Sequence, residues 1–280
     1  MKTEIDAQKS GEVRHRGRHM VLVPAVYIAP AAYIAAVLWL RRYWPAVAAR
    51  TGISVFHPYL RSAIRQGLLA GFALFMLAVT RQTNIFSRNT VGFRKGLFTG
   101  VYLLAVSAGT ILYEMVGADG FQDRGNIVYS TLYFILVGIT EELIFRGITA
   151  DLILRNNPDK VRMSVFLSGF LFSLYHAVNF QSADARGVLF QMVGTFLLGM
   201  LLTAIYYRTG SIRLVIFLHA LNDIAAAFPV TVLQSTDKID DIISGYGWID
   251  ILMLLPYLLV LAVLLRKEKR AEIRKMWESW

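Results

Sequence analysis

The residues best suited to chemistry in this chain lie at the end of an apolar segment. Glu141, Glu142 and Arg146 follow the apolar run 127–140. A carboxylate that loses its hydration shell persists in apolar surroundings only beside a partner or in a polar cavity. On a helix, Glu142 and Arg146 stand at positions i and i+4 and face each other, whereas Glu141 points about 100° away. The spacing predicts one paired and one available carboxylate, although a helix end exposed to water would explain the same residues equally well.

Two further apolar segments carry ionisable side chains. His176 ends the sequence Phe172-Ser-Leu-Tyr-His, and His219 precedes Asp223 by one helical turn. A lone histidine on an apolar helix is usually a packing residue, but polar residues inside membrane segments are costly and tend to be functional. Three such sites in one chain favour a shared function.

The depths of these groups predict that they meet. Glu141 lies 14 residues from Arg155, and His176 lies 14 residues from Arg162, so both are about 21 Å from the membrane face that the two arginines mark. The histidine and aspartate of the third segment lie 6 and 10 residues beyond Arg213. They are therefore about 9 and 15 Å deep and reach the same layer if their helix is tilted.

The chemistry open to these groups is limited. The chain has no cysteine and no HExxH motif, which excludes thiol nucleophiles, disulfides and the common zinc-protease motif. A glutamate shielded from bulk water is a competent general base for a water molecule. His176 would hold that water, and His219 would donate a hydrogen bond to the oxyanion that forms on a peptide carbonyl, which is worth about 3 kcal/mol per good donor.

These residues resemble the motifs of a known family, the CAAX-prenyl-protease and bacteriocin-processing (CPBP, or Abi) intramembrane glutamic endopeptidases. The family motifs are EExxxR, FxxxH and HxxxN or HxxxD. The chain matches all three in order, over about residues 127–230, with Glu141, Glu142 and Arg146, with Phe172 and His176, and with His219 and Asp223.

The resemblance implies an all-α bundle of eight transmembrane helices that hydrolyses peptide bonds without a cofactor. In that family the first glutamate and the histidine of the second motif activate water, which assigns Glu141 and His176. Glu142 with Arg146 would brace the site, and His219 with position 223 would form the oxyanion side. Some members trim prenylated CAAX proteins, and others are linked to peptide maturation or bacteriocin immunity, so the substrate is a peptide or protein in or at the membrane.

Asp223 departs from the asparagine that prenyl proteases typically carry. An ionised aspartate would repel an oxyanion, so Asp223 is either protonated or serves to orient and charge His219. The adjacent Asn222 could also donate, but it faces about 100° away on a helix. Asn179, three residues after His176, would add a polar contact to the site or mark a helix end.

The composition predicts a membrane protein, since 56% of the residues are hydrophobic and only 17% are charged. The helix that carries Glu141 should continue to Leu154 and stop before Pro158. The apolar segment 66–80 is short for a span, so its helix should begin earlier, within residues 59–64. Eight apolar segments are candidates for spans of about 20 residues, namely 20–40, 66–80, 96–117, 127–154, 163–180, 188–207, 211–230 and 248–265.

The distribution of basic residues predicts the orientation. With the N-terminus inside, 21 of the 29 lysines and arginines fall in cytoplasmic segments, which places both termini in the cytoplasm of a multi-pass cell-membrane protein. The basic first loop, 41–65, does not fit and is expected to lie along the interface as a short helix. The net charge of +10 then reflects contact with anionic lipids, and nothing indicates nucleic-acid binding.

Three regions are expected: a polar, disordered cytoplasmic tail (1–19), one transmembrane domain (20–265) and a basic tail (266–280). No cleavable signal peptide is evident, because about 21 apolar residues follow the polar stretch. The basic tail, with Trp277 and Trp280, predicts either an interfacial helix or a solvated segment.

Three other functions remain open at this point. Glu141, His176 and His219 have the ligand character that zinc accepts, which allows a metal-dependent form of the same protease. Buried Glu and His also suit a proton-linked transporter. The third possibility is a non-catalytic immunity or assembly factor with the same fold.

Overall fold

The computed structural model is a bundle of helices, and it describes residues 24–88, 91, 93–116, 124–229 and 239–279. No strand occurs among these residues. The expected tail 1–19, Trp280 and parts of the loops near 117–123 and 230–238 lie outside the described residues. The helices are α2 (Ala25–Thr51), α3 (Pro58–Val79), α4 (Phe93–Thr99), α5 (Val101–Val116), α6 (Arg124–Glu142), α7 (Asp151–Asn156), α8 (Val161–Tyr175), α9 (Ala185–Thr209), α10 (Ile212–Phe228), α11 (Ile239–Ser244), α12 (Trp248–Leu254), α13 (Pro256–Leu264) and α14 (Lys267–Glu278), with short turns at η1 (Ile53–Val55), η2 (Thr83–Phe86) and η4 (His176–Gln181).

The predicted count of eight spans is not reached in the part of the chain that the structure describes. Five helices there are long and apolar enough to cross a membrane, and a sixth candidate is a bent pair, 248–264 with 267–278. The expected span 211–230 corresponds to α10, which has only 17 residues. The expected span 96–117 is divided at Gly100, although the hydrogen bonds Gly100 N–H to Gly96 C=O (3.3 Å) and Leu104 N–H to Gly100 C=O (3.0 Å) continue the helical pattern across the division.

The first loop was predicted wrongly. Helix α2 does not end near residue 40 but continues through Arg41 to Thr51, where Gly52 stops it with a left-handed φ of 75°. Pro45 lies inside this helix without ending it, and Arg41 is accommodated because it donates hydrogen bonds to the Val178 carbonyl and to Asn179. The second span does begin early, as expected: Pro58 opens α3, and the His57 ring accepts the Tyr59 N–H at 3.2 Å.

The helix that carries the two glutamates is continuous but changes its winding directly after them. Helix α6 ends at Glu142, the π-helix η3 (Leu143–Ala150) follows, and α7 completes a run of 32 residues that ends at Asn156. This end lies just before Pro158, as predicted. All eight residues of η3 are buried, and π-turns inside α-helices often occur at functional sites.

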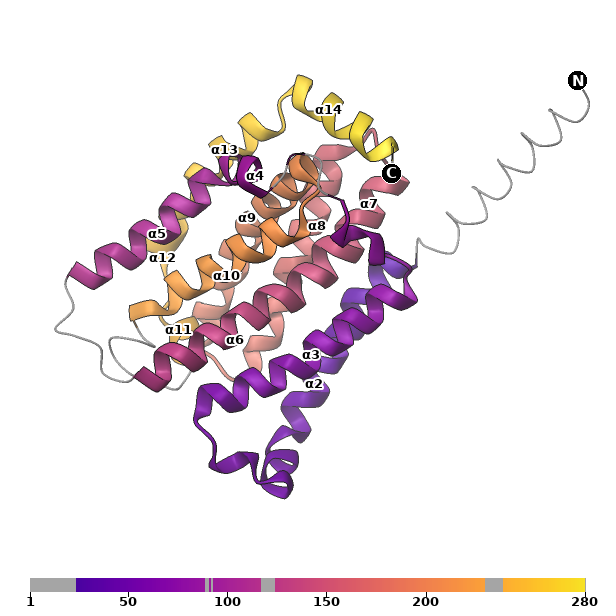
Figure 1. Ribbon diagram of the computed structural model, residues 1–280. Coiled ribbons are helices and arrows are strands. Elements are labelled where there is room, and N and C mark those ends of the chain that lie inside the picture. The colour runs from indigo at the N-terminus through magenta and orange to yellow at the C-terminus, as the bar shows by residue number, and fades with distance from the viewer. Residues whose placement is uncertain (1–23, 89–90, 92, 117–123, 230–238, 280) are drawn as a thin grey trace, which may run out of the picture.

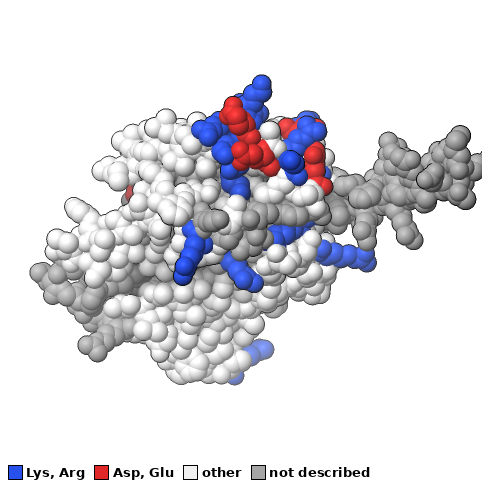
Figure 2. Space-filling view, turned by 45° about the horizontal axis from the view of Figure 1, so that its top comes forward, with Lys and Arg blue, Asp and Glu red and all other residues white. Residues whose placement is uncertain are grey.

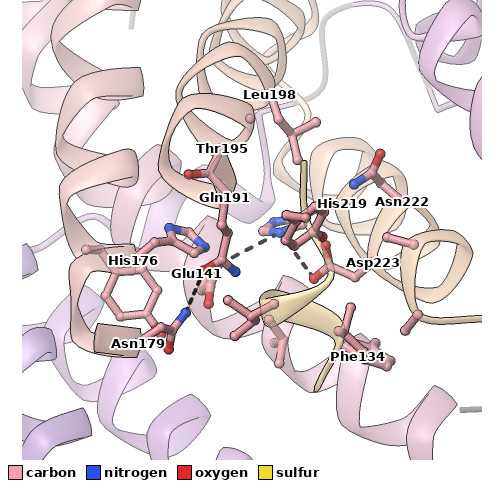
Figure 3. A pocket seen from close by; sticks show the side chains of 18 of the residues that line it. Phe134, Glu141, His176, Asn179, Gln191, Thr195, Leu198, His219, Asn222 and Asp223 are labelled. Atoms are coloured by element: carbon pink, nitrogen blue, oxygen red, sulfur yellow. Dashed lines mark hydrogen bonds and ion pairs between the residues drawn. The ribbon is translucent and has the colours of Figure 1, made fainter. Parts of the chain in front are cut away.

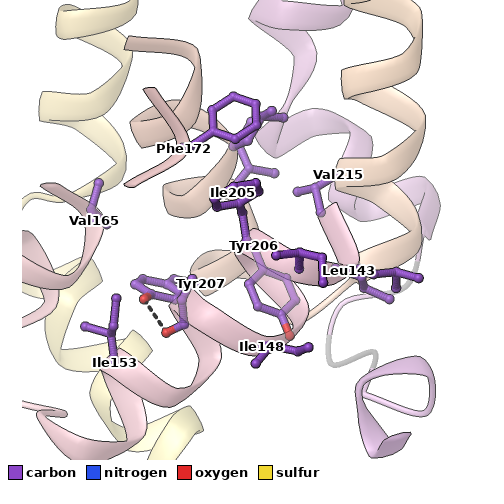
Figure 4. Close-up of a cluster of buried hydrophobic side chains, with 14 of the residues drawn as sticks. Leu143, Ile148, Ile153, Val165, Phe172, Ile205, Tyr206, Tyr207 and Val215 are labelled. Carbon is purple, nitrogen blue, oxygen red and sulfur yellow. Dashed lines mark hydrogen bonds between the residues drawn. The ribbon is translucent and has the colours of Figure 1, made fainter. Parts of the chain in front are cut away.

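The core lies around this π-helix. Leu143 and Ile148 of η3 belong to one buried cluster with Val165 of α8, Ile205 of α9 and Val215 of α10, and Figure 4 shows Leu143 next to Val215. The buried Tyr207 hydroxyl donates to the carbonyl of Ala150 at 2.7 Å and ties α9 to the end of η3.

Helix α14 packs on the protein rather than standing free of it. Ile273 and Trp277 are buried, and the Trp277 indole N–H donates to the Tyr207 carbonyl at 3.1 Å. Trp277 therefore faces the protein, whereas in an interfacial helix it would face lipid. Lys, Arg, Asp and Glu side chains gather over the end of the bundle where α14 lies, whereas much of the remaining visible surface is uncharged (Figure 2). This contrast is typical of a membrane protein whose apolar surface faces lipid and whose basic end is exposed to water.

Candidate active site

The two glutamates at the end of α6 have different partners, as the helical spacing predicted. Glu142 is fully buried and forms an ion pair with Arg146 one turn later. The Arg146 guanidinium also donates to the Gly199 carbonyl at 3.1 Å and lies 4.4 Å above the centre of the Phe172 ring. Because Glu142, Gly199 and Phe172 come from three parts of the bundle, Arg146 holds α6, α8 and α9 in one arrangement.

His219 is the group that joins the two glutamates. Its Nδ1 lies 2.7 Å from Oε1 of Glu142. A carboxylate only accepts, so Nδ1 carries a proton, and Nε2 is left to face the cavity. That Nε2 lies 3.8 Å from Oε2 of Glu141 and 3.4 Å from Oδ2 of Asp223 (Figure 3). Three carboxylates therefore surround one imidazole and can balance a positive charge on it.

Glu141 is a shielded carboxylate at the edge of a cavity. The residue is 5% exposed, and its side chain lines a cavity of about 1000 Å³. None of the buried ion pairs among the described residues brings an arginine or lysine to Glu141. A carboxylate that is shielded from bulk water, faces a cavity and has no arginine or lysine paired with it is available to take a proton.

His176 presents one defined nitrogen to the same cavity. Its Nδ1 lies 2.8 Å from the Phe172 carbonyl, and a carbonyl only accepts, so Nδ1 donates and the neutral ring keeps Nε2 as an acceptor. His176 is the first residue of η4, where α8 tightens into a 3-10 turn. The ring is held by its own helix and is ready to bind a water molecule.

Phe172 contacts three other residues of the site. Its ring contacts His176 and His219 edge to face, with centroid distances of 4.9 and 5.6 Å, in addition to the Arg146 guanidinium. The sequence assigned Phe172 to the motif only by its spacing. In the structure its ring packs against both histidines and against Arg146.

The two asparagines named from the sequence do not point at the reacting groups. Asn179 is held between Arg41, whose Nη2 donates to its Oδ1 at 2.6 Å, and Gln191, which accepts from its Nδ2 at 2.8 Å. Its role is to join α2, η4 and α9. Asn222 lines the cavity, but its side chain points away from Glu141 (Figure 3), as the helical geometry predicted.

The cavity is large and has two kinds of wall. Apolar side chains such as Val37, Leu69 and Phe134 line it together with charged groups from several helices. It reaches from Glu141 to Tyr246, which lies between α11 and α12, and to Asp250 of α12. A space of this size accepts a peptide segment rather than a water molecule alone.

The zinc alternative was tested on the arrangement of the donors. Among the described residues, no three His, Asp or Glu side chains are grouped so as to hold a metal ion. Glu141, His176 and His219 share the cavity but do not converge on one point. We therefore derive no step through a metal.

Comparison with known proteins agrees with this geometry. The fold and site define a multi-helix membrane protein with a buried glutamate and two histidines around a cavity. Residues 123–225 match the family described as type II CAAX prenyl endopeptidase Rce1-like. No curated protein and no solved structure matched the chain. The match supports the resemblance seen in the three motifs, since residues 123–225 are similar to this family of CAAX prenyl endopeptidases. Together with the apolar helices, it makes the chain an integral membrane protein.

Several residues of the site were missed by sequence reasoning. Arg41 and Gln191 bind Asn179, and Tyr175, the residue before His176, packs against that histidine with a centroid distance of 5.0 Å. Arg41 was assigned to a loop because its charge argued against a span. The sequence offered no clear signal for the longer helix, because Pro45 lies between Leu40 and Gly52 and a proline usually interrupts a helix.

Proposed function

We propose that this protein is an intramembrane endopeptidase in which Glu141 activates a water molecule. The observation that supports this most directly is the convergence of Glu141, His176 and His219, from three separate helices, on one cavity large enough for a peptide. The family match supports the reaction class. A silent relative would gain nothing from keeping these groups desolvated.

In the proposed reaction, water sits between the Glu141 carboxylate and Nε2 of His176, which accepts one of its hydrogen bonds. Glu141 takes the other proton as the oxygen attacks the scissile carbonyl. His219, protonated on both nitrogens, donates from Nε2 to the oxyanion that develops. Glu141 then delivers its proton to the leaving amine, the carbon–nitrogen bond breaks, and the base is regenerated.

Asp223 fits this scheme as a charge partner of His219. Its Oδ2 lies on the Nε2 side of the ring at 3.4 Å, while Glu142 holds the Nδ1 side. Two carboxylates on opposite edges stabilise an imidazolium. Of the two explanations considered for this aspartate, the second, that it charges and orients His219, is the one the geometry supports better.

The proposed substrate is a membrane-associated or lipidated peptide, cut in the manner of a CAAX protease. We further propose a multi-pass arrangement in the cell membrane with both termini in the cytoplasm, and contact with anionic lipids through the basic end that carries α14. No nucleic acid and no cofactor enter this proposal.

The test compares substrates in living cells. The proteome of membrane and lipidated peptides is compared between cells with the wild type, with Glu141→Gln and with Glu114→Gln, a matched change on α5 outside the cavity. We expect the same cleaved ends with the wild type and Glu114→Gln, and none with Glu141→Gln, while all three proteins reach the membrane in equal amounts. Cleavage that persists with Glu141→Gln would refute the mechanism, and equal peptide profiles in all strains would favour a transporter or a non-catalytic factor.

A further inference from the structure

Two arginines line the catalytic cavity without a carboxylate partner. Arg41 of α2 and Arg65 of α3 are both partly buried. The ion pairs among the described residues include neither of them. The water-activation scheme uses neither residue. Since a partly desolvated cation is costly unless an anion accompanies it, these two charges call for a partner that the chain itself does not supply.

Arg41 is held in place with donors to spare. Its Nη1 donates to the Val178 carbonyl at 3.0 Å and its Nη2 to Oδ1 of Asn179 at 2.6 Å. A guanidinium has five N–H donors, so these two bonds orient the group and leave others for a ligand. Asn179 lies three residues after His176, which places this cation within about one helical turn of the catalytic machinery.

Arg65 lies on the neighbouring wall. Ser62, Arg65 and Leu69 line the cavity at the spacing of one face of α3. Helices α3 and α6 run side by side (Figure 1). The face of α6 that lines the cavity presents Tyr133, Val137 and Glu141 at intervals of about one turn. Arg65 forms no hydrogen bond or ion pair in the described part of the chain, so all of its guanidinium N–H donors are available to a ligand.

The charges in the cavity are therefore separated. The cations belong to the α2 and α3 wall, and the acids other than Glu141 belong to the α10 and α12 side, as Asp223 and Asp250. A peptide that enters this field is oriented by its own charge, because an acidic group is attracted to one wall and repelled by the other.

We propose that Arg65, together with Arg41, binds a carboxylate of the peptide substrate and makes the protease selective for peptides that carry an acidic group. The pair are specificity-determining residues rather than catalytic ones, and the inference rests on the proposed function, because it assigns the substrate of that same site. A guanidinium pairs with a carboxylate through two parallel hydrogen bonds, which gives direction as well as affinity.

The test uses quenched-fluorescent peptides with the protein in phosphatidylcholine vesicles. Peptides come in matched pairs that differ in one group: a free C-terminal carboxylate against its amide, and an internal Asp or Glu against Asn or Gln. Arg61→Gln is the control for Arg65→Gln, since Arg61 lies one turn earlier on α3, bonds the Ser54 carbonyl at 3.0 Å and does not line the cavity. Arg42→Gln is the control for Arg41→Gln.

The wild type should prefer the acidic member of one pair type by about tenfold or more in kcat/KM, as loss of one partner of a desolvated charge pair does. Arg65→Gln and Arg41→Gln should reduce that ratio toward one, through KM, and the two controls should keep it. The pair type that shows the effect distinguishes a terminal from a side-chain carboxylate. Absence of an acidic preference, or an equal loss for acidic and neutral peptides with Arg65→Gln, would overturn the proposal.

Two arms separate this proposal from its rivals. Binding of the same peptides to Glu141→Gln is measured by fluorescence anisotropy. If binding is selective for acidic peptides and depends on Arg65, but the wild type cleaves none of them, the carboxylate site stands and the protease mechanism is wrong.

The second arm adds phosphatidylglycerol to the vesicles. If Arg65→Gln abolishes a dependence on this anionic lipid while peptides are not distinguished by charge, the partner of Arg65 is a lipid phosphate and the peptide-carboxylate proposal fails.

Discussion

Nδ1 of His219 lies 2.7 Å from Oε1 of Glu142, the same carboxylate oxygen that pairs with Arg146. One buried acid therefore neutralises the bracing arginine and fixes the orientation of the proposed oxyanion donor. This shared partner couples the stability of the bundle to the geometry of the site.

Replacing Glu142 with Gln should damage both properties. The change leaves the Arg146 charge buried and unpaired, which we expect to lower the free energy of unfolding by about 3–5 kcal/mol. The measurement is unfolding of the detergent-solubilised protein against temperature or denaturant, with Glu141→Gln as the comparison, which should unfold close to the wild type.

A double variant separates the two effects. Glu142→Gln with Arg146→Gln removes both charges and should recover part of the lost stability, yet activity should stay low because a neutral amide no longer balances the positive charge on His219. Wild-type stability in the single variant, or full activity in the double variant, would contradict the dual role of Glu142.

Asp223→Asn should retain cleavage. An asparagine amide can donate to an oxyanion, which replaces by direct donation what Asp223 contributes through the charge on His219. Asp223→Ala offers neither function and should lower kcat about tenfold or more. Initial rates on one cleaved peptide, at equal amounts of folded protein, compare the three forms. Equal rates for the alanine and wild-type forms would show that Asp223 takes no part.

Asp151 is a buried charge outside the cavity whose loss should affect stability and not chemistry. It is fully buried between Arg88 and Arg155, the latter at 2.9 Å. Asp151→Asn leaves two guanidinium groups without their shared anion, and the free energy of unfolding should fall by about 3–5 kcal/mol. The activity per folded molecule should be close to that of the wild type, because this residue does not line the cavity.

The control for this variant is Asp159→Asn. The ion pair of Asp159 with Arg274 is exposed to solvent, where such pairs contribute little. Its unfolding temperature should match that of the wild type, and a loss as large as that of Asp151→Asn would show that burial does not explain the difference.

Chelation should leave proteolysis intact. The proposed reaction uses Glu141 and two histidines alone, so prolonged dialysis against a strong chelator is expected to preserve kcat and KM, measured on the peptide used above. A loss of activity that only added zinc reverses would replace the proposed mechanism by the metal-dependent one.

The sequence by itself determined the features that depend on local geometry. The pairing of Glu142 with Arg146 follows from their separation by four residues on one helix, and the position of Glu141 and His176 on one cavity agrees with their equal separations along the chain from Arg155 and Arg162. The end of the long helix before Pro158 follows from the missing N–H of proline. These predictions depend on spacing along one helix, and the π-helix η3 changes the winding too little to separate Glu142 from Arg146.

Only the tertiary structure decided the contacts between helices. The bond of His219 to Glu142, the position of Phe172 on Arg146 and the link of Arg41 to Asn179 all join residues that are far apart along the chain. The continuation of α2 to Thr51 belongs with them, since a charged residue such as Arg41 is tolerated in a long helix once Val178 and Asn179 accept hydrogen bonds from it. Partners of this kind are set by which helix faces pack together, and packing depends on the shape of the whole bundle rather than on any one segment.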